Sequence, residues 1–218
     1  MNKLEIRTSG TFEKVDGESR KIHGLAIVAE SKSQLLRSKN HMFYEMIQRS
    51  AINDDIIKNN DIKLYMNHDS QQGTLARSKY GEGSLKLFIT ERGLEFETEL
   101  PETEKGNELL RGIERGDYDA ISFAFIAGQD HYDEKPNEDG SWNRYIDSFN
   151  MIDEISVLSC APAYLATEVS CRSLDDIADE YDKRAQEEEA KKEEERINAI
   201  HERNQAILKD LADSIAEV

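Results

Sequence analysis

The 218-residue chain is strongly acidic, because 45 Asp and Glu residues outnumber 28 Lys and Arg residues and give a formal charge of −17. Such a charge repels nucleic-acid phosphates and anionic membranes, so we expect neither nucleic acid nor a membrane among the partners. No apolar run approaches the roughly 20 residues that span a bilayer, the first ten residues lack the apolar core of a signal peptide, and the chain has only two cysteines. We therefore expect the protein to stay inside the cell that makes it.

Alternation of apolar and polar residues predicts seven β-strands in the first 172 residues. The clearest alternation lies at residues 93–100, where Leu94, Phe96 and Leu100 share one face and three glutamates share the other. This pattern is typical of an antiparallel strand with one exposed face. In chain order, the predicted strands cover residues 3–12, 20–29, 62–66, 84–90, 93–100, 120–127 and 152–159.

Two helices are predicted in the same part of the chain. Residues 40–58 place Phe43, Met46 and Ile47 on one helical face, and residues 104–115 form a helical pattern that ends at Gly116.

The polar stretch 128–144 contains a proline and a glycine, and it predicts a long hairpin loop. Regular strands with few crossover helices favour a mainly β, α+β fold over a doubly wound parallel sheet. We expect an antiparallel β-barrel or sandwich with peripheral helices.

The composition changes after about residue 172. From Leu174 onward glycine, proline and tryptophan are absent, and strong helix formers of mixed charge predict a long charged helix. We therefore expect a β domain at 1–172 and a helical tail at 173–218. Near its end, an apolar seam at three-and-four spacing is formed by Ile197, Ile200, Ile207 and Leu211. This seam is compatible with self-association through a short coiled coil, with docking on a partner, or with a monomeric amphipathic helix.

Three predicted strands carry or adjoin a residue of a catalytic type. His68 follows the third strand, Ser122 lies on the small-residue face of the sixth, and Glu154 lies in the seventh. A serine nucleophile needs a base within hydrogen-bond reach, and an imidazole base needs an acceptor on its other nitrogen. Ser122, His68 and Glu154 could supply these roles, although spacing alone also fits an ordinary strand serine, turn histidine and edge-strand glutamate. Ser156 and Ser159 are rival nucleophiles, but they lie in the strand that would supply the acid.

A metal-dependent hydrolase is a third interpretation. It would need more ligands at coordinating spacing, whereas His68 and the His131 loop are isolated, and neither HExxH nor paired CxxC occurs. We expect no metal and no cofactor.

Three segments together resemble the prohead maturation proteases of tailed bacteriophages. They are residues 67–75 (NHDSQQGTL), residues 93–125 (from GLEFETELPET to GDYDAISFAF) and residues 152–164 (IDEISVLSCAPAY). The resemblance covers about residues 20–168. It implies a serine endopeptidase whose β-barrel is similar to that of the herpesvirus assemblin proteases.

The resemblance also implies which residues are catalytic. His68 and Ser122 correspond to the family's catalytic pair. The family's acidic residue before Ile/Val-Ser-Val falls on Glu154, with the adjacent Asp153 as the alternative. Backbone N–H groups would stabilise the oxyanion, and residues 73–78 are either a source of them or an ordinary hairpin turn.

Membership of this family would place the protein in the host cytoplasm, inside the assembling prohead. There it would cut scaffolding segments from the major capsid protein and then cut itself. The alternative is a non-catalytic scaffold protein that uses the β domain for contacts and the tail for assembly. The presence of a serine, a histidine and an acid together argues against this alternative.

Overall fold

The computed structural model describes residues 4–16, 18–38, 40–159 and 196–197. The chain divides into two compact units, Met1–Cys171 and Arg172–Val218, and all the described strands belong to the first. The predicted helical tail at 173–218 lies outside the described residues except for Arg196 and Ile197, so its structure and its self-association stay predictions.

Nine strands form the larger of two β-sheets. They are β1 (Glu5–Asp16), β2 (Lys21–Val28), β5 (Asp61–Met66), β6 (Ala76–Lys79), β7 (Glu82–Gly83), β8 (Lys86–Thr90), β9 (Gly93–Glu99), β10 (Ala120–Ala127) and β13 (Phe149–Leu158). Their order in the sheet is β7-β6-β5-β13-β10-β1-β2-β9-β8. All seven predicted strands are confirmed among them; β10 has the predicted bounds, and the other six have shifted ends.

The sheet is mixed and open. β13 and β5 run parallel, and the other neighbouring pairs are antiparallel. Among the described strands β7 and β8 each have one neighbour in this sheet, so the sheet does not close on itself. The expectation of a mainly β fold with few helices is confirmed, but the predicted antiparallel barrel is wrong, because its edges do not meet.

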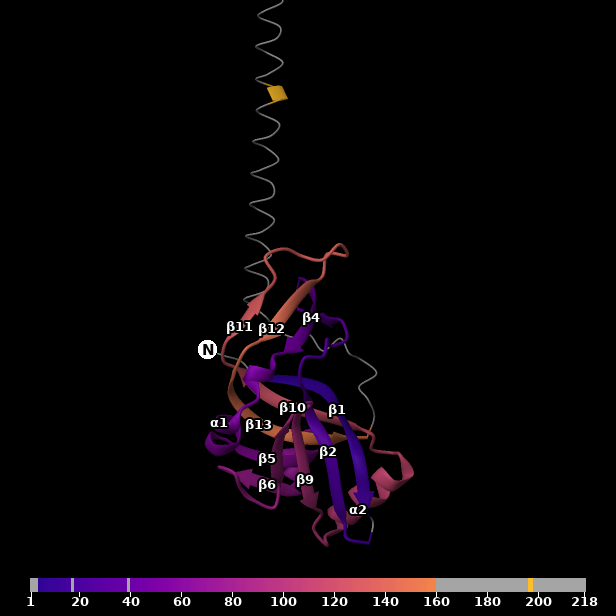
Figure 1. The fold of residues 1–218 in the computed structure, drawn as a ribbon. Coiled ribbons are helices and arrows are strands. Elements are labelled where there is room, and N and C mark those ends of the chain that lie inside the picture. The colour runs from indigo at the N-terminus through magenta and orange to yellow at the C-terminus, as the bar shows by residue number, and fades with distance from the viewer. Residues whose placement is uncertain (1–3, 17, 39, 160–195, 198–218) are drawn as a thin grey trace, which may run out of the picture. The chain divides into compact units, whose positions relative to one another are not determined.

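A second, smaller sheet has four strands. They are β3 (Leu36–Arg37), β4 (Met42–Ile47), β11 (Asp130–Tyr132) and β12 (Trp142–Ile146), in the order β11-β12-β4-β3. β12 and β4 run parallel, and the other two pairs are antiparallel. Figure 1 shows β11, β12 and β4 grouped at one end of the unit.

Strand β4 lies where we predicted the helix at residues 40–58, so that prediction is wrong over its first half. Phe43 and Ile47 are spaced for one face of a helix, but they also fit alternate positions of a strand, and the structure buries both with Glu45 between them. Pairing with β12 satisfies the backbone of β4 and decides between the two patterns. The helical part is limited to the turn η1 (Arg49–Ala51) and to α1 (Asp54–Asn59).

The predicted loop at 128–144 contains β11 and the first residues of β12. The two strands pair as a hairpin, so the hairpin is confirmed and its loop is shorter than expected. Trp142, Arg144 and Ile146 are buried in alternation along β12. This alternation was missed because a charged residue occupies one of the buried positions.

Four charged side chains, called the ionic cluster below, join β1 to the small sheet: Glu5, Arg7, Glu45 and Arg144. Arg7 donates to the two carboxylate oxygens of Glu45 at 2.7 and 2.8 Å. Arg144 donates to Glu5 at 2.6 and 3.0 Å and to Glu45 at 3.0 Å. Burial acts to raise the pKa of Glu5, but the hydrogen bond and charge of Arg144 and the charge of Arg7 hold that pKa below its usual range.

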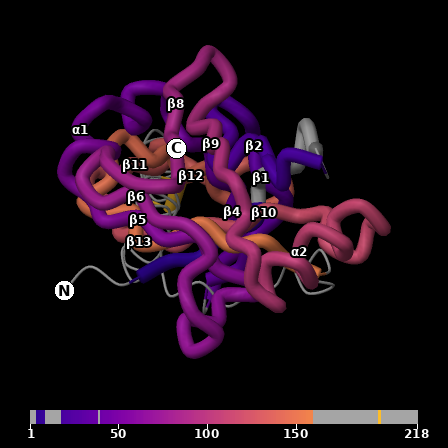
Figure 2. Tube along the Cα trace, turned by 90° about the horizontal axis from the view of Figure 1, so that it is seen from below, coloured from indigo at the N-terminus to yellow at the C-terminus, as the bar shows by residue number. Residues whose placement is uncertain are grey.

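Helix α2 (Glu104–Arg115) has the predicted bounds. Thr103 caps its start by accepting a hydrogen bond from the Gly106 N–H at 3.2 Å, and Gly116 ends it in the left-handed conformation at φ 81°. Its apolar face, which includes Leu109 and Ile113, packs into the hydrophobic core. Figure 2 shows α1 and α2 on opposite sides of the unit.

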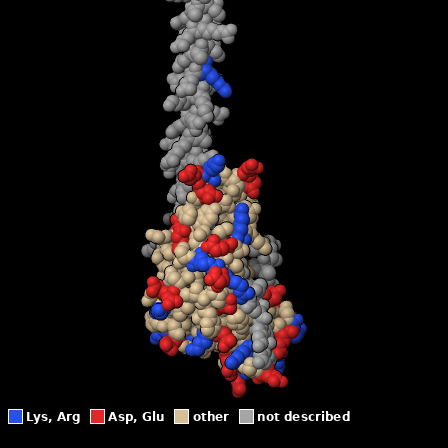
Figure 3. Space-filling view, in the orientation of Figure 1, with Lys and Arg blue, Asp and Glu red and all other residues tan. Residues whose placement is uncertain are grey.

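The surface of the described residues is charged but mixed. On the face shown in Figure 3, acidic and basic side chains are interspersed. Among the described residues, no helix is long and apolar enough to cross a membrane.

Candidate active site

The parallel pairing of β5 and β13 brings His68 to Glu154. His68 lies just beyond the end of β5, and Glu154 lies in β13 opposite Lys63 of β5. The Nδ1 atom of His68 forms a hydrogen bond with Oε1 of Glu154, whose side chain is 8% exposed. A buried carboxylate at Nδ1 fixes the ring and leaves Nε2 free to accept a proton from a nucleophile.

Asp153, the alternative acid, contacts a different partner. The pairing of β13 with β10 passes from Ile152 to Glu154 and skips Asp153, which therefore lies in a β-bulge. Its carboxylate accepts a hydrogen bond from Nζ of Lys63 at 3.1 Å. The structure thus brings Glu154 and not Asp153 to the imidazole of His68.

Ser122 lies on the strand at the other side of β13. It is directly opposite Ser156, while Glu154 is opposite Ala124, so Ser122 and Glu154 are diagonal neighbours on one face of the sheet. Diagonal neighbours in an antiparallel pair lie about 7–8 Å apart. An imidazole that hydrogen-bonds through both nitrogens spans a similar distance, so His68 can bridge Glu154 and Ser122.

The hydroxyl of Ser122 is engaged elsewhere in this structure. It is fully buried, and its Oγ donates to the backbone carbonyl of Arg7 in β1 at 2.9 Å. Catalytic hydrogen bonds are often long or unformed in a free enzyme and form in the complex with substrate. For Ser122 to act as a nucleophile, its hydroxyl would have to become accessible and turn from Arg7 to His68.

Asp69, the residue after His68, has a structural role. Its carboxylate accepts hydrogen bonds from Nε2 of Gln72 at 2.7 Å and from the N–H of Gln71 at 2.9 Å, and it begins the short helix η2 (Ser70–Gln72). The hydrogen bond from Gln72, with those from the backbone, lowers the pKa of Asp69. Asp69 therefore stabilises the loop after His68 in its charged form.

Residues 73–78 have an ordinary role in the sheet. The N–H groups of Gly73, Leu75 and Arg77 donate to Ser70, Leu64 and Ser84. Because these three N–H groups already donate to acceptors in the turn and around β6, they favour the interpretation of residues 73–78 as a turn and strand rather than as a source of oxyanion donors.

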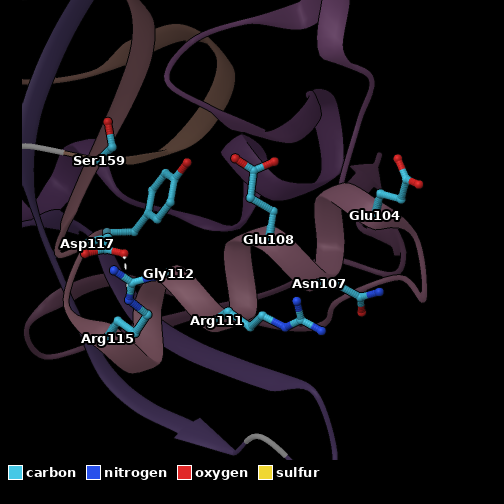
Figure 4. Close-up of a pocket in the computed structure, with 9 residues that line it drawn as sticks. Glu104, Asn107, Glu108, Arg111, Gly112, Arg115, Asp117 and Ser159 are labelled. Atoms are coloured by element: carbon cyan, nitrogen blue, oxygen red, sulfur yellow. Dashed lines mark ion pairs between the residues drawn. The ribbon is translucent and has the colours of Figure 1, made fainter.

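A pocket of about 680 Å³ lies between α2 and the end of β13. Figure 4 shows Ser159 and the carboxylate of Glu108 on the same side of α2, while Arg115 pairs with Asp117 at 3.2 Å. Burial, together with the charges of Glu108 and Asp117, raises the pKa of Tyr118, which also lines the pocket. Ser159 donates its N–H and its hydroxyl to Oδ1 of Asn67, the residue before His68, so one lining residue of the pocket contacts the turn that carries His68.

Metal ligands are not grouped in the part of the chain that the structure describes. No three His, Cys, Asp or Glu side chains there are placed to hold an ion.

Sequence reasoning did not identify the hydrogen bonds of Asn67 with Val157 and Ser159, or the hydrogen bond of His68 with Ser156. The one signal in the sequence that pointed to Ser156 was that it shares a strand face with Glu154.

One comparison with known proteins identifies a family. Residues 3–180 match the sequence model of the caudovirus prohead serine proteases. The capsid assembly protease gp21 of bacteriophage T4 is a similar solved structure, with a TM-score of 0.41 and 13% sequence identity, covering 71% of this chain and 96% of that chain. No curated protein sequence matches the chain. Because the family match covers most of the chain, the protein belongs to the caudovirus prohead serine protease family.

Proposed function

We propose that the protein is a prohead maturation protease, a serine endopeptidase that cuts scaffolding segments from the major capsid protein and then cuts itself. The observation that carries the proposal is the hydrogen bond between His68 and Glu154, one strand from Ser122, in a chain of this family. His68 contacts Glu154, and Glu154 lies diagonally across from Ser122 in the neighbouring strand, although 32 to 86 positions separate the three residues in the chain. A scaffold protein without activity would have no chemical need for this arrangement.

The proposed mechanism begins with attack of the Ser122 oxygen on the carbonyl carbon of the scissile peptide bond. Nε2 of His68 takes the hydroxyl proton, and Glu154 accepts the Nδ1–H hydrogen bond and stabilises the imidazolium. The tetrahedral intermediate collapses when His68 gives the proton to the leaving amine. Water then attacks the acyl carbon while Nε2 of His68 takes its proton. His68 gives this proton to the Ser122 oxygen as the acyl group leaves, which regenerates Ser122.

The proposed substrates and location follow from the family. The similar T4 protein is named for capsid assembly, and we assign this chain to the inside of the assembling prohead in the host cytoplasm. Its partners would be the major capsid protein, with its scaffolding segments, and other copies of the protease. We propose no nucleic-acid or membrane partner, since the acidic chain repels both.

The test is mass spectrometry of the cognate major capsid protein co-expressed with the wild-type protein, with Ser122→Ala or with His68→Ala. We expect discrete truncation of the capsid protein by the wild type and a loss of at least about 10⁴-fold in both variants. Ser50→Ala and His131→Gln are matched controls, because both residues are on the surface outside the site, and they should cleave as the wild type does.

Two results would contradict the proposal. Cleavage by Ser122→Ala at the wild-type rate would assign the nucleophile to another residue. Co-assembly of the wild type with an uncut capsid protein would favour the scaffold alternative.

A further inference from the structure

His68 lies in a turn whose backbone conformation is unfavourable for residues with a side chain. Asn67 has φ 50° and His68 has φ 60°, and the N–H of Asp69 donates to the carbonyl of Met66 at 3.0 Å. Two consecutive positive φ angles inside such a hydrogen-bonded turn define type I′, which glycine, asparagine and aspartate adopt most readily. Histidine at the second position needs support from its surroundings.

The support comes from β13, the strand that also carries Glu154. The N–H of Asn67 donates to the carbonyl of Val157 at 2.9 Å, and the N–H of His68 donates to Oγ of Ser156 at 3.3 Å. In return, Oδ1 of Asn67 accepts from both the N–H and the Oγ of Ser159, at 3.0 and 3.3 Å. Backbone and side-chain hydrogen bonds thus attach both turn residues to one strand.

Ser156 is placed to connect the base with the nucleophile. It is fully buried, it lies directly opposite Ser122, and its oxygen accepts the N–H of His68 itself. Among the described residues, three side chains form hydrogen bonds with the two turn residues. Ser156 accepts from the N–H of His68, Ser159 donates its hydroxyl to Asn67, and Glu154 bonds to the ring of His68.

We propose that Asn67 and Ser156 are positioning residues that hold the turn against β13 and keep the imidazole of His68 on the line from Glu154 to Ser122. The proposal rests on the proposed function, because it assigns His68 the role of base. A misplacement of about 1 Å in a catalytic group can lower a rate by about 100-fold. The loss should therefore appear in kcat, while substrate binding and KM change little.

The experiment compares two variants at position 67 with one at position 156. Asn67→Gly keeps the tolerance for positive φ but removes Oδ1, whereas Asn67→Asp keeps both an acceptor oxygen and that tolerance. Ser156→Ala removes only the oxygen that accepts from His68. We expect kcat on a capsid-protein peptide to fall about 10- to 100-fold in Asn67→Gly and Ser156→Ala, and to stay within about threefold of the wild type in Asn67→Asp.

A second measurement reports on the base without substrate. The proton between Nδ1 of His68 and Glu154 should give a far-downfield proton NMR signal, assigned by its loss in His68→Ala. We expect the signal in the wild type and in Asn67→Asp, and its loss or displacement in Asn67→Gly and Ser156→Ala. Urea unfolding midpoints of all variants separate this effect from global destabilisation.

The outcomes distinguish the two proposals. Wild-type kcat and an unchanged signal in both Asn67→Gly and Ser156→Ala would overturn the positioning role, even if Ser122→Ala abolishes cleavage. If the signal depends on Asn67 and Ser156 but the wild type cuts no capsid peptide, the positioning role stands and the protease function fails.

Discussion

Two neighbouring carboxylates of β13 have different partners, although the sequence offers either of them as the acid. Glu154 contacts His68, while Asp153 lies in a β-bulge and binds Lys63. A bulge places one extra residue in a strand and redirects its side chain. The local backbone, rather than the chemistry of the side chain, therefore separates the carboxylate that contacts His68 from the one that forms a partly exposed ion pair.

Substitution of the two carboxylates should give very different rates. Glu154→Gln keeps the shape but allows the wrong imidazole tautomer, and we expect kcat to fall by about 10⁴-fold. Asp153→Asn removes an ion pair with a partly exposed partner, so kcat should change by less than about threefold. Steady-state kinetics with one capsid peptide measure both. Equal losses in the two variants would mean that the bulge residue also takes part in catalysis.

At this scale the sequence offered candidates for the site residues but did not reveal their environment. Ser122, His68 and Glu154 could be named from their strands and from the family resemblance. The hydrogen bond from His68 to Ser156 could not, because it depends on two positive φ angles that alternation does not encode. The contact of Ser122 with the Arg7 carbonyl depends on strand order, which one sequence does not reveal.

Among the elements, β1 has two separate roles. One of its backbone carbonyls accepts the hydroxyl of Ser122, and its Glu5 and Arg7 side chains belong to the ionic cluster with β4 and β12. Buried charges are costly unless they are fully paired, and loss of one partner leaves the others uncompensated. The ionic cluster therefore makes the attachment of the small sheet sensitive to changes in single charges.

Glu5→Gln should weaken this attachment in a manner that depends on pH. The folded-state pKa of Glu5 lies below the ordinary value of 4.5, so its contribution to stability is present above that pH and is lost as the pH falls through the folded pKa. We expect Glu5→Gln to lower the free energy of unfolding by about 2 kcal/mol at neutral pH, the usual worth of a hydrogen bond to a charged group. Below pH 4.5 the difference from the wild type should shrink.

Urea unfolding of both proteins at neutral and acidic pH measures the effect. A difference that stays constant as the pH falls would show that the charge of Glu5 does not contribute to the stability of the fold.

Strands with apolar residues at their inward positions were predictable, including β10, which is buried on both faces, whereas β4 and β12, which carry a buried charge, were not. The alternation of β9 and β10 gave their bounds closely. β4 and β12 each bury a charged residue of the ionic cluster, Glu45 and Arg144, at a position where the pattern requires an apolar one. The partners that neutralise these charges come from distant parts of the chain, so a local pattern cannot detect them.

For the molecule as a whole, the described strands all lie before residue 160, while the family match extends to residue 180. We expect removal of residues 173–218 to leave the β domain folded, because the change in composition near residue 172 marks the boundary. Removal of residues 181–218 is the matched control, since it keeps every residue of the family match.

Circular dichroism and urea unfolding of the two shortened proteins test this boundary. We expect both to keep the β-sheet signal and the cooperative transition of the full chain. A loss of cooperativity in the shorter protein alone would place residues 173–180 within the domain.

The position of β13 has a consequence for the time at which the site forms during synthesis. β13 is the last of the described strands in the chain, yet in the sheet it lies between β5 and β10. Without it, the sheet consists of two unconnected parts, β7-β6-β5 beside His68 and the five strands from β10 to β8 with Ser122.

A growing chain on the ribosome can fold local hairpins early, but it can join these two parts only after residue 158 has emerged. The same strand delivers Glu154. The proposed base and nucleophile can therefore come together only after β13, the last of the described strands, has been made, and translation itself would delay the proposed cleavage until then.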